Sequence, residues 1–192
     1  MAQSGRRITA EMWVEAAYAR FTKSGLGAVR VEAVARDLGT TKGSFYWHHA
    51  DREALVQAVM ERWEAEETER AIAAASAESD PRARLRSLFA TVAARAGRRR
   101  GESSLYLDAE REGVTDFVTR VTRRRVDFVA GLLVELGFDK DEAERRAVLS
   151  LAVALGMQQM DRGTRPHLPF DQTLLTETAF VMTVTPPPGS GR

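Results

Sequence analysis

Apolar residues recur at a spacing of three or four along almost the whole chain, as on one face of an α-helix. No stretch keeps the strict apolar–polar alternation of a half-buried strand. Before Pro166 the only proline is Pro81, so little interrupts this pattern. We therefore predict an all-α fold of about nine helices, at residues 9–23, 31–38, 42–48, from the cap Asp51 onward, 81–96, 104–111, 114–136, 139–160 and 171–182.

Polar residues and glycines indicate where these helices begin and end. Four residues stand before predicted helices and can cap them with a side-chain oxygen: Thr41, Asp51, Asp80 and Asp139. Gly39 separates the helices at 31–38 and 42–48, because glycine readily adopts the backbone conformation of a tight turn. Two short helices joined in this way form a helix-turn-helix, whose second helix fits the major groove of DNA.

The second helix of this motif carries residues that suit contact with bases. Thr41 caps its N-terminus, which faces the phosphates. Lys42 and Ser44 can hydrogen-bond to base edges, and Gly43 lets the backbone approach closely. The motif therefore predicts contact with double-stranded DNA.

Phosphate contacts are expected from the residues that follow. Tyr46 and His48 offer hydrogen bonds to flanking phosphates, and Arg52 adds a charge at the start of the next helix. The free N–H groups of that helix form an anion site. We predict three regions: a helix-turn-helix DNA-binding domain at 1–52, a helical effector-binding and dimerisation domain at 53–184, and a flexible tail at 185–192.

A longer pattern surrounds these residues, in regular order and spacing: Phe21, Gly25, Val34-Ala35, Leu38-Gly39, the run from Thr41 to His48, Arg52-Glu53 and Leu55. It resembles the DNA-binding domain of the TetR (tetracycline-repressor-like) family of bacterial transcriptional regulators, over roughly the first third of the chain. The resemblance implies that Lys42, Gly43, Ser44 and Trp47 face bases, and that Thr41, Tyr46, His48 and Arg52 contact the backbone.

Two positions depart from the family pattern. Arg30 stands where a Ser or Thr usually caps the second helix, and loss of such a cap costs about 1 kcal/mol. Arg30 can instead reach a phosphate, which would strengthen binding in a salt-dependent way. His49 replaces the usual phenylalanine, and we expect it to lie partly exposed beside the turn.

Composition and charge limit which signals and partners the chain can have. The chain has 192 residues and no cysteine, which excludes disulfides and thiol chemistry, so any sensed signal is a bound molecule. The net charge of +1 divides into +3 for residues 1–49, with seven Lys/Arg and four Asp/Glu, and −2 for the rest. Positive charge therefore lies where the DNA-binding residues lie. No apolar run approaches the roughly 20 residues of a membrane span, so we expect a cytoplasmic protein.

Other functions fit the sequence less well. The chain lacks a glycine-rich phosphate loop, a G-x-S-x-G elbow and paired His–acid metal spacing, so we predict no enzyme, no cofactor and no metal. His48 and His49 lie about 100° apart on a helix and have no third ligand nearby. Arg98–Arg100 and Arg123–Arg125 are interpreted as solvated surface. A helical dimeric adaptor without specific DNA binding is the alternative.

The resemblance also implies a small-molecule effector and a homodimer that reads a pseudo-palindromic operator as a repressor. Candidate effector-lining residues, equally suited to a core, are Trp63, Phe89, Tyr106, Phe117, Phe128, Met157 and Met160. They predict an apolar or aromatic ligand. The predicted dimer helices are 141–160 and 171–182, with contacts from Ala147, Leu151, Ala152, Ala154, Leu155, Gly156 and Gln158, and from Leu174, Leu175, Thr178, Ala179 and Met182.

Overall fold

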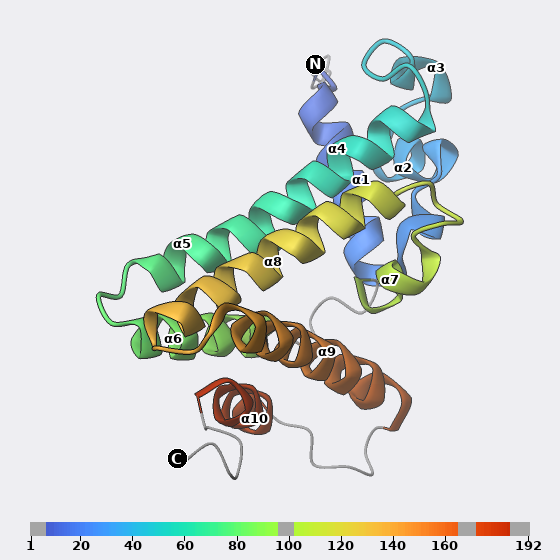
Figure 1. Ribbon diagram of the computed structural model, residues 1–192. Coiled ribbons are helices and arrows are strands. Elements are labelled where there is room, and N and C mark those ends of the chain that lie inside the picture. The colour runs from blue at the N-terminus through green and yellow to red at the C-terminus, as the bar shows by residue number, and fades with distance from the viewer. Residues whose placement is uncertain (1–6, 96–101, 165–171, 185–192) are drawn as a thin grey trace. The chain divides into compact units, whose positions relative to one another are not determined.

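The computed structural model describes residues 7–95, 102–164 and 172–184, and within these ranges the regular elements are helical, without a β-strand (Figure 1). The all-α prediction is therefore confirmed. The chain forms two compact units. Unit 1 comprises residues 1–64 and 99–118, and unit 2 comprises residues 65–98 and 119–192. Because these units reflect packing alone, the functional division at residue 52 stays a prediction.

Unit 1 holds the N-terminal helices and a later segment of the chain. Its elements are α1 (Ala10–Ser24), the 3₁₀ turn η1 (Leu26–Ala28), α2 (Val31–Asp37), α3 (Lys42–Phe45), α4 (Arg52–Glu64), the 3₁₀ turn η3 (Glu102–Ser104) and α7 (Leu105–Asp108). Helix α1 packs against α2 and α4, and α2 packs against α3. Trp13, Phe21 and Phe45 are fully buried, so apolar burial joins α3 to α1.

Unit 2 is a bundle of longer helices. Its elements are the π-helical turn η2 (Ala65–Glu69), α5 (Arg70–Ser76), α6 (Pro81–Arg95), most of α8 (Thr115–Glu135), α9 (Lys140–Thr164) and α10 (Gln172–Val184). Helix α10 packs against α6 and α9 (Figure 1). Leu85 and Phe89 of α6 share one hydrophobic core with Leu133 of α8 and Ala143 and Ala147 of α9.

The predicted caps are confirmed by hydrogen bonds. The Thr41 hydroxyl accepts from Ser44 N at 3.4 Å, and an Asp51 carboxylate oxygen accepts from Ala54 N at 2.8 Å. Asp80 and Asp139 cap α6 and α9 in the same way. These side chains satisfy N–H groups that have no partner within the helix, which fixes each starting point.

The predicted long fourth helix is wrong in one respect. It is divided into α4 and α5 by the π-helical turn η2, so the nine predicted helices correspond to α1–α10 in the described residues. Leu55, Val59 and Trp63 are buried one turn apart along α4. The next buried residue after Trp63 is Thr68, five positions on, because a π turn accommodates one extra residue.

Other corrections concern helix ends and faces. Helix α3 ends at Phe45 rather than at 48, and the predicted helix at 104–111 is α-helical only from Leu105 to Asp108. Ala147, expected at the dimer surface, is buried in the core of unit 2. Arg98–Arg100, Asp171 and the predicted tail at 185–192 lie outside the described residues.

No helix in the described ranges is long and apolar enough to cross a membrane.

Candidate nucleic-acid interface

The helix-turn-helix of unit 1 is held in place by a tight turn and an ion pair. Gly39 has a φ of 64°, a left-handed conformation that favours glycine. After it, the backbone N–H of Thr40 donates a hydrogen bond to Ala35 O at 2.9 Å. The Arg20 guanidinium of α1 donates to the Asp37 carboxylate of α2, with one bond of 2.8 Å, and lowers the pKa of that carboxyl group. The backbone turn and the charged bond together fix α2 relative to α1.

Helix α3 rests on a buried aromatic ring. Phe45 is fully buried, and its ring meets that of Trp13 edge to face, with 5.2 Å between the centroids. The sequence predicts this position, because Phe45 should point back onto the first helix together with Phe21, and its burial in the core is confirmed. Tyr46 and His49 also contact the Phe45 ring, at 5.2 and 5.5 Å between centroids. Phe45 therefore links α3, the turn after it and α1.

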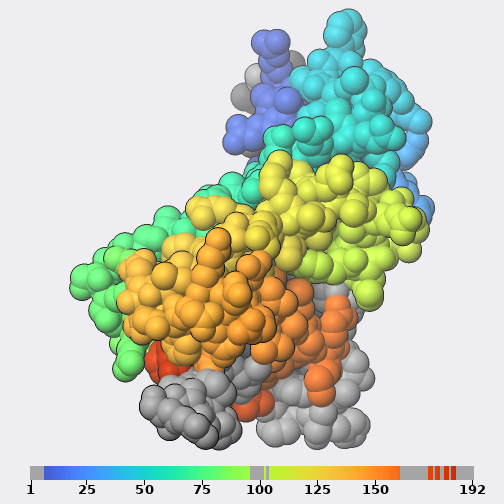
Figure 2. Space-filling view, viewed as in Figure 1, coloured from blue at the N-terminus to red at the C-terminus, as the bar shows by residue number. Residues whose placement is uncertain are grey.

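The opposite side of α3 is open to solvent. Trp47 is 88% exposed and Tyr46 is 56% exposed, unusual for such large rings in a well-packed unit. Thr41, Lys42 and Gly43 are also exposed. In the space-filling view the cyan region around residues 40–50 projects from unit 1 (Figure 2). The structure thus gathers these predicted contact residues on one exposed segment, although Tyr46, Trp47 and His48 lie in a turn rather than in the helix.

Gly43 has no need of a glycine's backbone freedom. It is not among the glycines with positive φ, and a Cβ atom built on it would lie 3.6 Å from Thr41 Oγ1, an ordinary contact. The fold would therefore tolerate a methyl group at this exposed position. A requirement for glycine here would have to come from a partner outside the chain.

Lys42 has a partner within the protein. Its ammonium group lies 2.7 Å from the Glu32 carboxylate of α2, and both side chains are exposed. This hydrogen bond raises the pKa of Lys42 and lowers the pKa of Glu32. Exposed pairs of this kind are weak and screened by salt, so Lys42 can leave Glu32 for a stronger acceptor.

His48 and His49 occupy different surroundings. Both are half-buried, and His49 stacks on Phe45 with 23° between the ring planes. The expectation that His49 is partly exposed beside the turn is confirmed, and the stacking explains how it takes the place of a phenylalanine. Burial lowers the pKa of His49, a hydrogen bond with the Ala10 backbone partly opposes this shift, and Nε2 is buried without a partner. Among the described residues no group of three His, Asp or Glu side chains is arranged to hold a metal ion.

The burial of His49 predicts a loss of stability in acid. Its pKa is lower in the folded chain than in the unfolded chain, where it is about 6.5. Its contribution is therefore complete above that value and is lost as the pH falls through the folded pKa. We expect His49→Phe to lose less thermal stability than the wild-type chain between pH 7.5 and 5.5, measured by circular dichroism. His48, whose charge also lowers the pKa of His49, is kept unchanged in both chains. A His49→Phe variant with the wild-type pH dependence would contradict this assignment.

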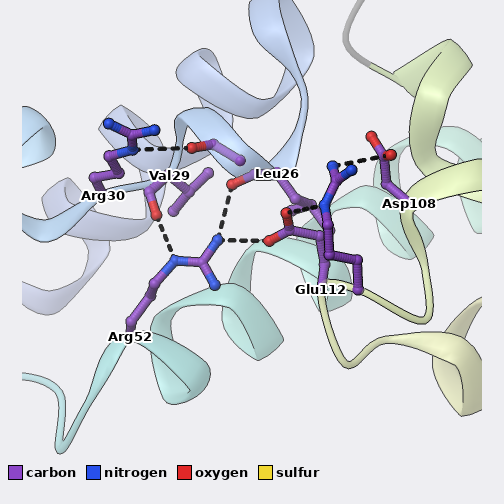
Figure 3. Close-up of polar contacts among 8 residues, drawn as sticks. Leu26, Val29, Arg30, Arg52, Asp108 and Glu112 are labelled. Carbon is purple, nitrogen blue, oxygen red and sulfur yellow. Dashed lines mark hydrogen bonds and ion pairs between the residues drawn. The ribbon is translucent and has the colours of Figure 1, made fainter.

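The two arginines predicted near phosphates differ in their contacts. Arg30 is exposed, and its Nε donates to Gly27 O at 3.3 Å. It occupies the N-cap of α2 without a capping hydrogen bond, as the sequence suggested. Arg52 instead donates to Val29 O at 2.7 Å, to Leu26 O at 3.0 Å and to Glu112 Oε2 at 2.7 Å (Figure 3). These bonds give Arg52 internal partners that the sequence did not indicate, and its phosphate contact stays a prediction.

The second arginine run of the sequence has partners inside unit 2. Arg123 pairs with Glu144 at 2.7 Å, Arg124 pairs with Glu69 at 3.1 Å, and Arg125 donates to Thr68 at 2.8 Å. Each partner lies on an adjoining element of the same unit. Arg123 and Arg124 are nevertheless exposed, so the interpretation of this run as solvated surface is confirmed for these two residues, and their exposed ion pairs are of the weak kind.

The predicted effector residues are spread over both units. Trp63, Tyr106 and Phe117 belong to unit 1, where Trp63 is buried and its indole N–H donates to Glu102 at 3.1 Å. Phe89 and Phe128 pack in the core of unit 2, and Met160 is about half exposed. The remaining candidate, Met157, is half-buried in α9. Their shared role as a ligand pocket stays a prediction.

The segment that contains this surface matches the sequence model of a known family. Residues 14–59 match the model of a family described as bacterial regulatory proteins, tetR family. The match begins in α1, includes α2, the Gly39 turn and α3, and ends in α4. No curated protein matches the chain.

Solved structures resemble this fold over most of their length. A transcriptional regulator from Rhodococcus sp. Rha1 is 18% identical, with a TM-score of 0.73 over 92% of this chain and 94% of that one. A putative transcriptional regulator from Saccharomonospora viridis, in complex with choline, is 18% identical, with a TM-score of 0.74 over 90% and 94%. The regulator FadR from Bacillus subtilis, in complex with stearoyl-CoA, is 13% identical, with a TM-score of 0.67 over 91% and 97%. At these identities the similarity concerns the fold.

Proposed function

We propose that this chain, whose residues 14–59 match the model of the tetR family of bacterial regulatory proteins, is a DNA-binding transcriptional regulator that responds to a small molecule. One observation carries the proposal: exposed Lys42, Tyr46 and Trp47 lie on a short segment anchored by the fully buried Phe45. An anchored segment with exposed polar and aromatic side chains suits entry into the major groove. Its backbone is already fixed, so little conformational entropy is lost when it binds.

The proposed contacts follow from the exposed residues. Lys42 leaves Glu32 and donates to a guanine N7 or O6 atom, and Trp47 places an apolar face against a thymine methyl group. Gly43 allows the backbone to approach the groove. The remaining contacts are assigned to Ser44 at a base and to Arg30, Thr41, Tyr46 and His48 at phosphates.

Exposed apolar residues on α9 support a homodimer. Val148 and Leu149 are half exposed, and Ala152, Gly156 and Met160 continue the same side at intervals of four residues. The small residues Ala152 and Gly156 permit close approach of a second helix along this ridge. Leu174 and Val181, seven positions apart on α10, are also exposed. We assign both faces to a second copy of the chain, since large exposed apolar side chains in a row favour association.

The proposed dimer and effector explain how the chain would bind an operator and be released from it. Two copies related by a two-fold axis would place two α3 segments about 34 Å apart, one turn of DNA, on a pseudo-palindromic operator. Two regulators of the same fold were solved with choline and stearoyl-CoA, which supports a small-molecule site in this chain as well. Its aromatic candidates favour an apolar or aromatic effector, whose binding releases a repressor from DNA in the cytoplasm.

Selection of DNA by the purified full chain tests this proposal. We expect a pool of random-sequence duplexes to yield an inverted repeat that binds with a Kd of about 1 µM or tighter at physiological salt. Its affinity should fall steeply as salt rises, because lysine and arginine contacts release counterions from DNA. Recovery of no sequence above the random background would contradict the proposed function.

A further inference from the structure

The turn between α7 and α8 is part of unit 1, although it lies far beyond the family-matched segment. Two backbone hydrogen bonds fix it: Glu112 N donates to Asp108 O, and Val114 N donates to Ala109 O, both at 2.9 Å. Gly113 reverses the chain with φ of 70°. The backbone of the turn thus holds Glu112 in a defined position.

The Glu112 carboxylate is largely withdrawn from water. Its side chain is 9% exposed, and one oxygen lies 2.7 Å from the Arg52 guanidinium. Arg111, which is exposed and paired with Asp108, approaches the other oxygen at 3.5 Å. Because a desolvated carboxylate is costly without a cation, Arg52 is the main partner that makes this position favourable.

Arg52 connects this carboxylate to the segment that precedes α2. Its other two hydrogen bonds go to the carbonyl oxygens of Leu26, the first residue of η1, and Val29, the residue directly after η1. The planar guanidinium presents its donors in a fixed fork, so three acceptors in place restrict its orientation. Of these three acceptors, the Glu112 carboxylate is the one that carries a charge.

The restrained carbonyls lie directly before a helix start that lacks its own cap. Helix α2 begins at Val31, and Arg30 at its N-cap makes no capping hydrogen bond. Helix α2 in turn packs against α3. The contacts therefore run from Glu112 through Arg52 to the start of α2, and from α2 to the exposed segment.

We propose that Glu112 is a positioning residue for DNA binding: it holds Arg52 across the carbonyls of Leu26 and Val29 and thereby fixes the start of α2 and the placement of α3. This inference rests on the proposed function. It assigns Arg52 an internal role in place of a phosphate contact. In the opposite case Glu112 competes with a phosphate for Arg52, and its removal would strengthen binding.

Two paired substitutions separate these cases. Glu112→Ala and the milder Glu112→Gln are compared with Glu110→Ala and Glu110→Gln, which remove the same charge from an exposed residue of the same turn. Hydrogen exchange of the amides of residues 29–34 is measured on the free full chain. Binding is measured with the duplex that the wild-type chain selects, over a range of salt concentrations.

We expect faster exchange and roughly tenfold weaker binding for the Glu112 variants, with the slope of affinity against salt unchanged. Arg52→Gln should weaken binding similarly without altering that slope, and the double variant should bind no more weakly than either single one. The Glu110 variants should match the wild type. Glu112→Gln keeps the size of the side chain and decides the outcome where Glu112→Ala is poorly folded.

Two results would overturn the proposal. The first is a Glu112 variant that matches its Glu110 control in exchange and in affinity. The second is tighter binding with a steeper salt dependence, which would make Arg52 a phosphate contact. A failure to select any duplex would contradict the proposed function instead, and the exchange measurement on the free chain would still decide whether Glu112 fixes α2.

Discussion

A chain with Lys42 and Tyr46 both changed to alanine is expected to bind its selected operator at least about a hundredfold more weakly than the wild-type chain. Both side chains are exposed, so their loss removes contacts with DNA without opening the core. Fluorescence anisotropy with the selected duplex measures the change.

Two controls separate this effect from general loss of charge or assembly. Lys23→Ala removes an exposed cation from the last turn of α1 and should bind within about twofold of the wild type. Sedimentation equilibrium should give the same oligomeric state for all three chains. A double variant that keeps wild-type affinity would favour the helical adaptor that the sequence left as an alternative.

Phe45→Ala is expected to lower the free energy of unfolding of unit 1 by about 3 kcal/mol. The ring is fully buried and contacts Trp13, Tyr46 and His49, so its removal leaves a cavity beneath α3. Urea unfolding followed by tryptophan fluorescence measures the loss. Operator binding should fall with it, because α3 loses its anchor on α1.

A matched variant tests whether volume explains this loss. Phe45→Leu fills most of the same space and should cost less than about 1.5 kcal/mol. Phe45→Ala with near wild-type stability would mean that the segment after α3 can collapse into the cavity. The anchoring role of Phe45 would then be wrong.

The sequence predicted the features that depend on neighbouring residues. Helix starts at Thr41, Asp51, Asp80 and Asp139 follow from local hydrogen bonds, and each is present in the fold. The burial of Phe45 followed from its place in the helical pattern. The segment that carries the exposed contact residues was also identified, because it combines a cap, a glycine turn and consecutive aromatic residues.

The features that the sequence missed depend on residues far apart in the chain. Glu112 lies beside Arg52 only after folding, and two of the acceptors of Arg52 are backbone carbonyls, which no residue type reveals. Ala147 fits a dimer surface and a core equally well, since an alanine is compatible with both, and only packing placed it in the core. The end of α3 at Phe45 was missed because aromatic residues after it continue a helical pattern.

The π-helical turn η2 shows where this fold absorbs a change in chain length. The buried positions Trp63, Thr68, Ala71 and Ala75 are separated by five, three and four residues. With one residue fewer between Trp63 and Thr68, the same positions would follow the four-three-four spacing of an uninterrupted α-helix. A relative that is one residue shorter here would keep the same buried side chains, so an alignment across this helix needs a gap at Ala65–Glu69 rather than in a loop.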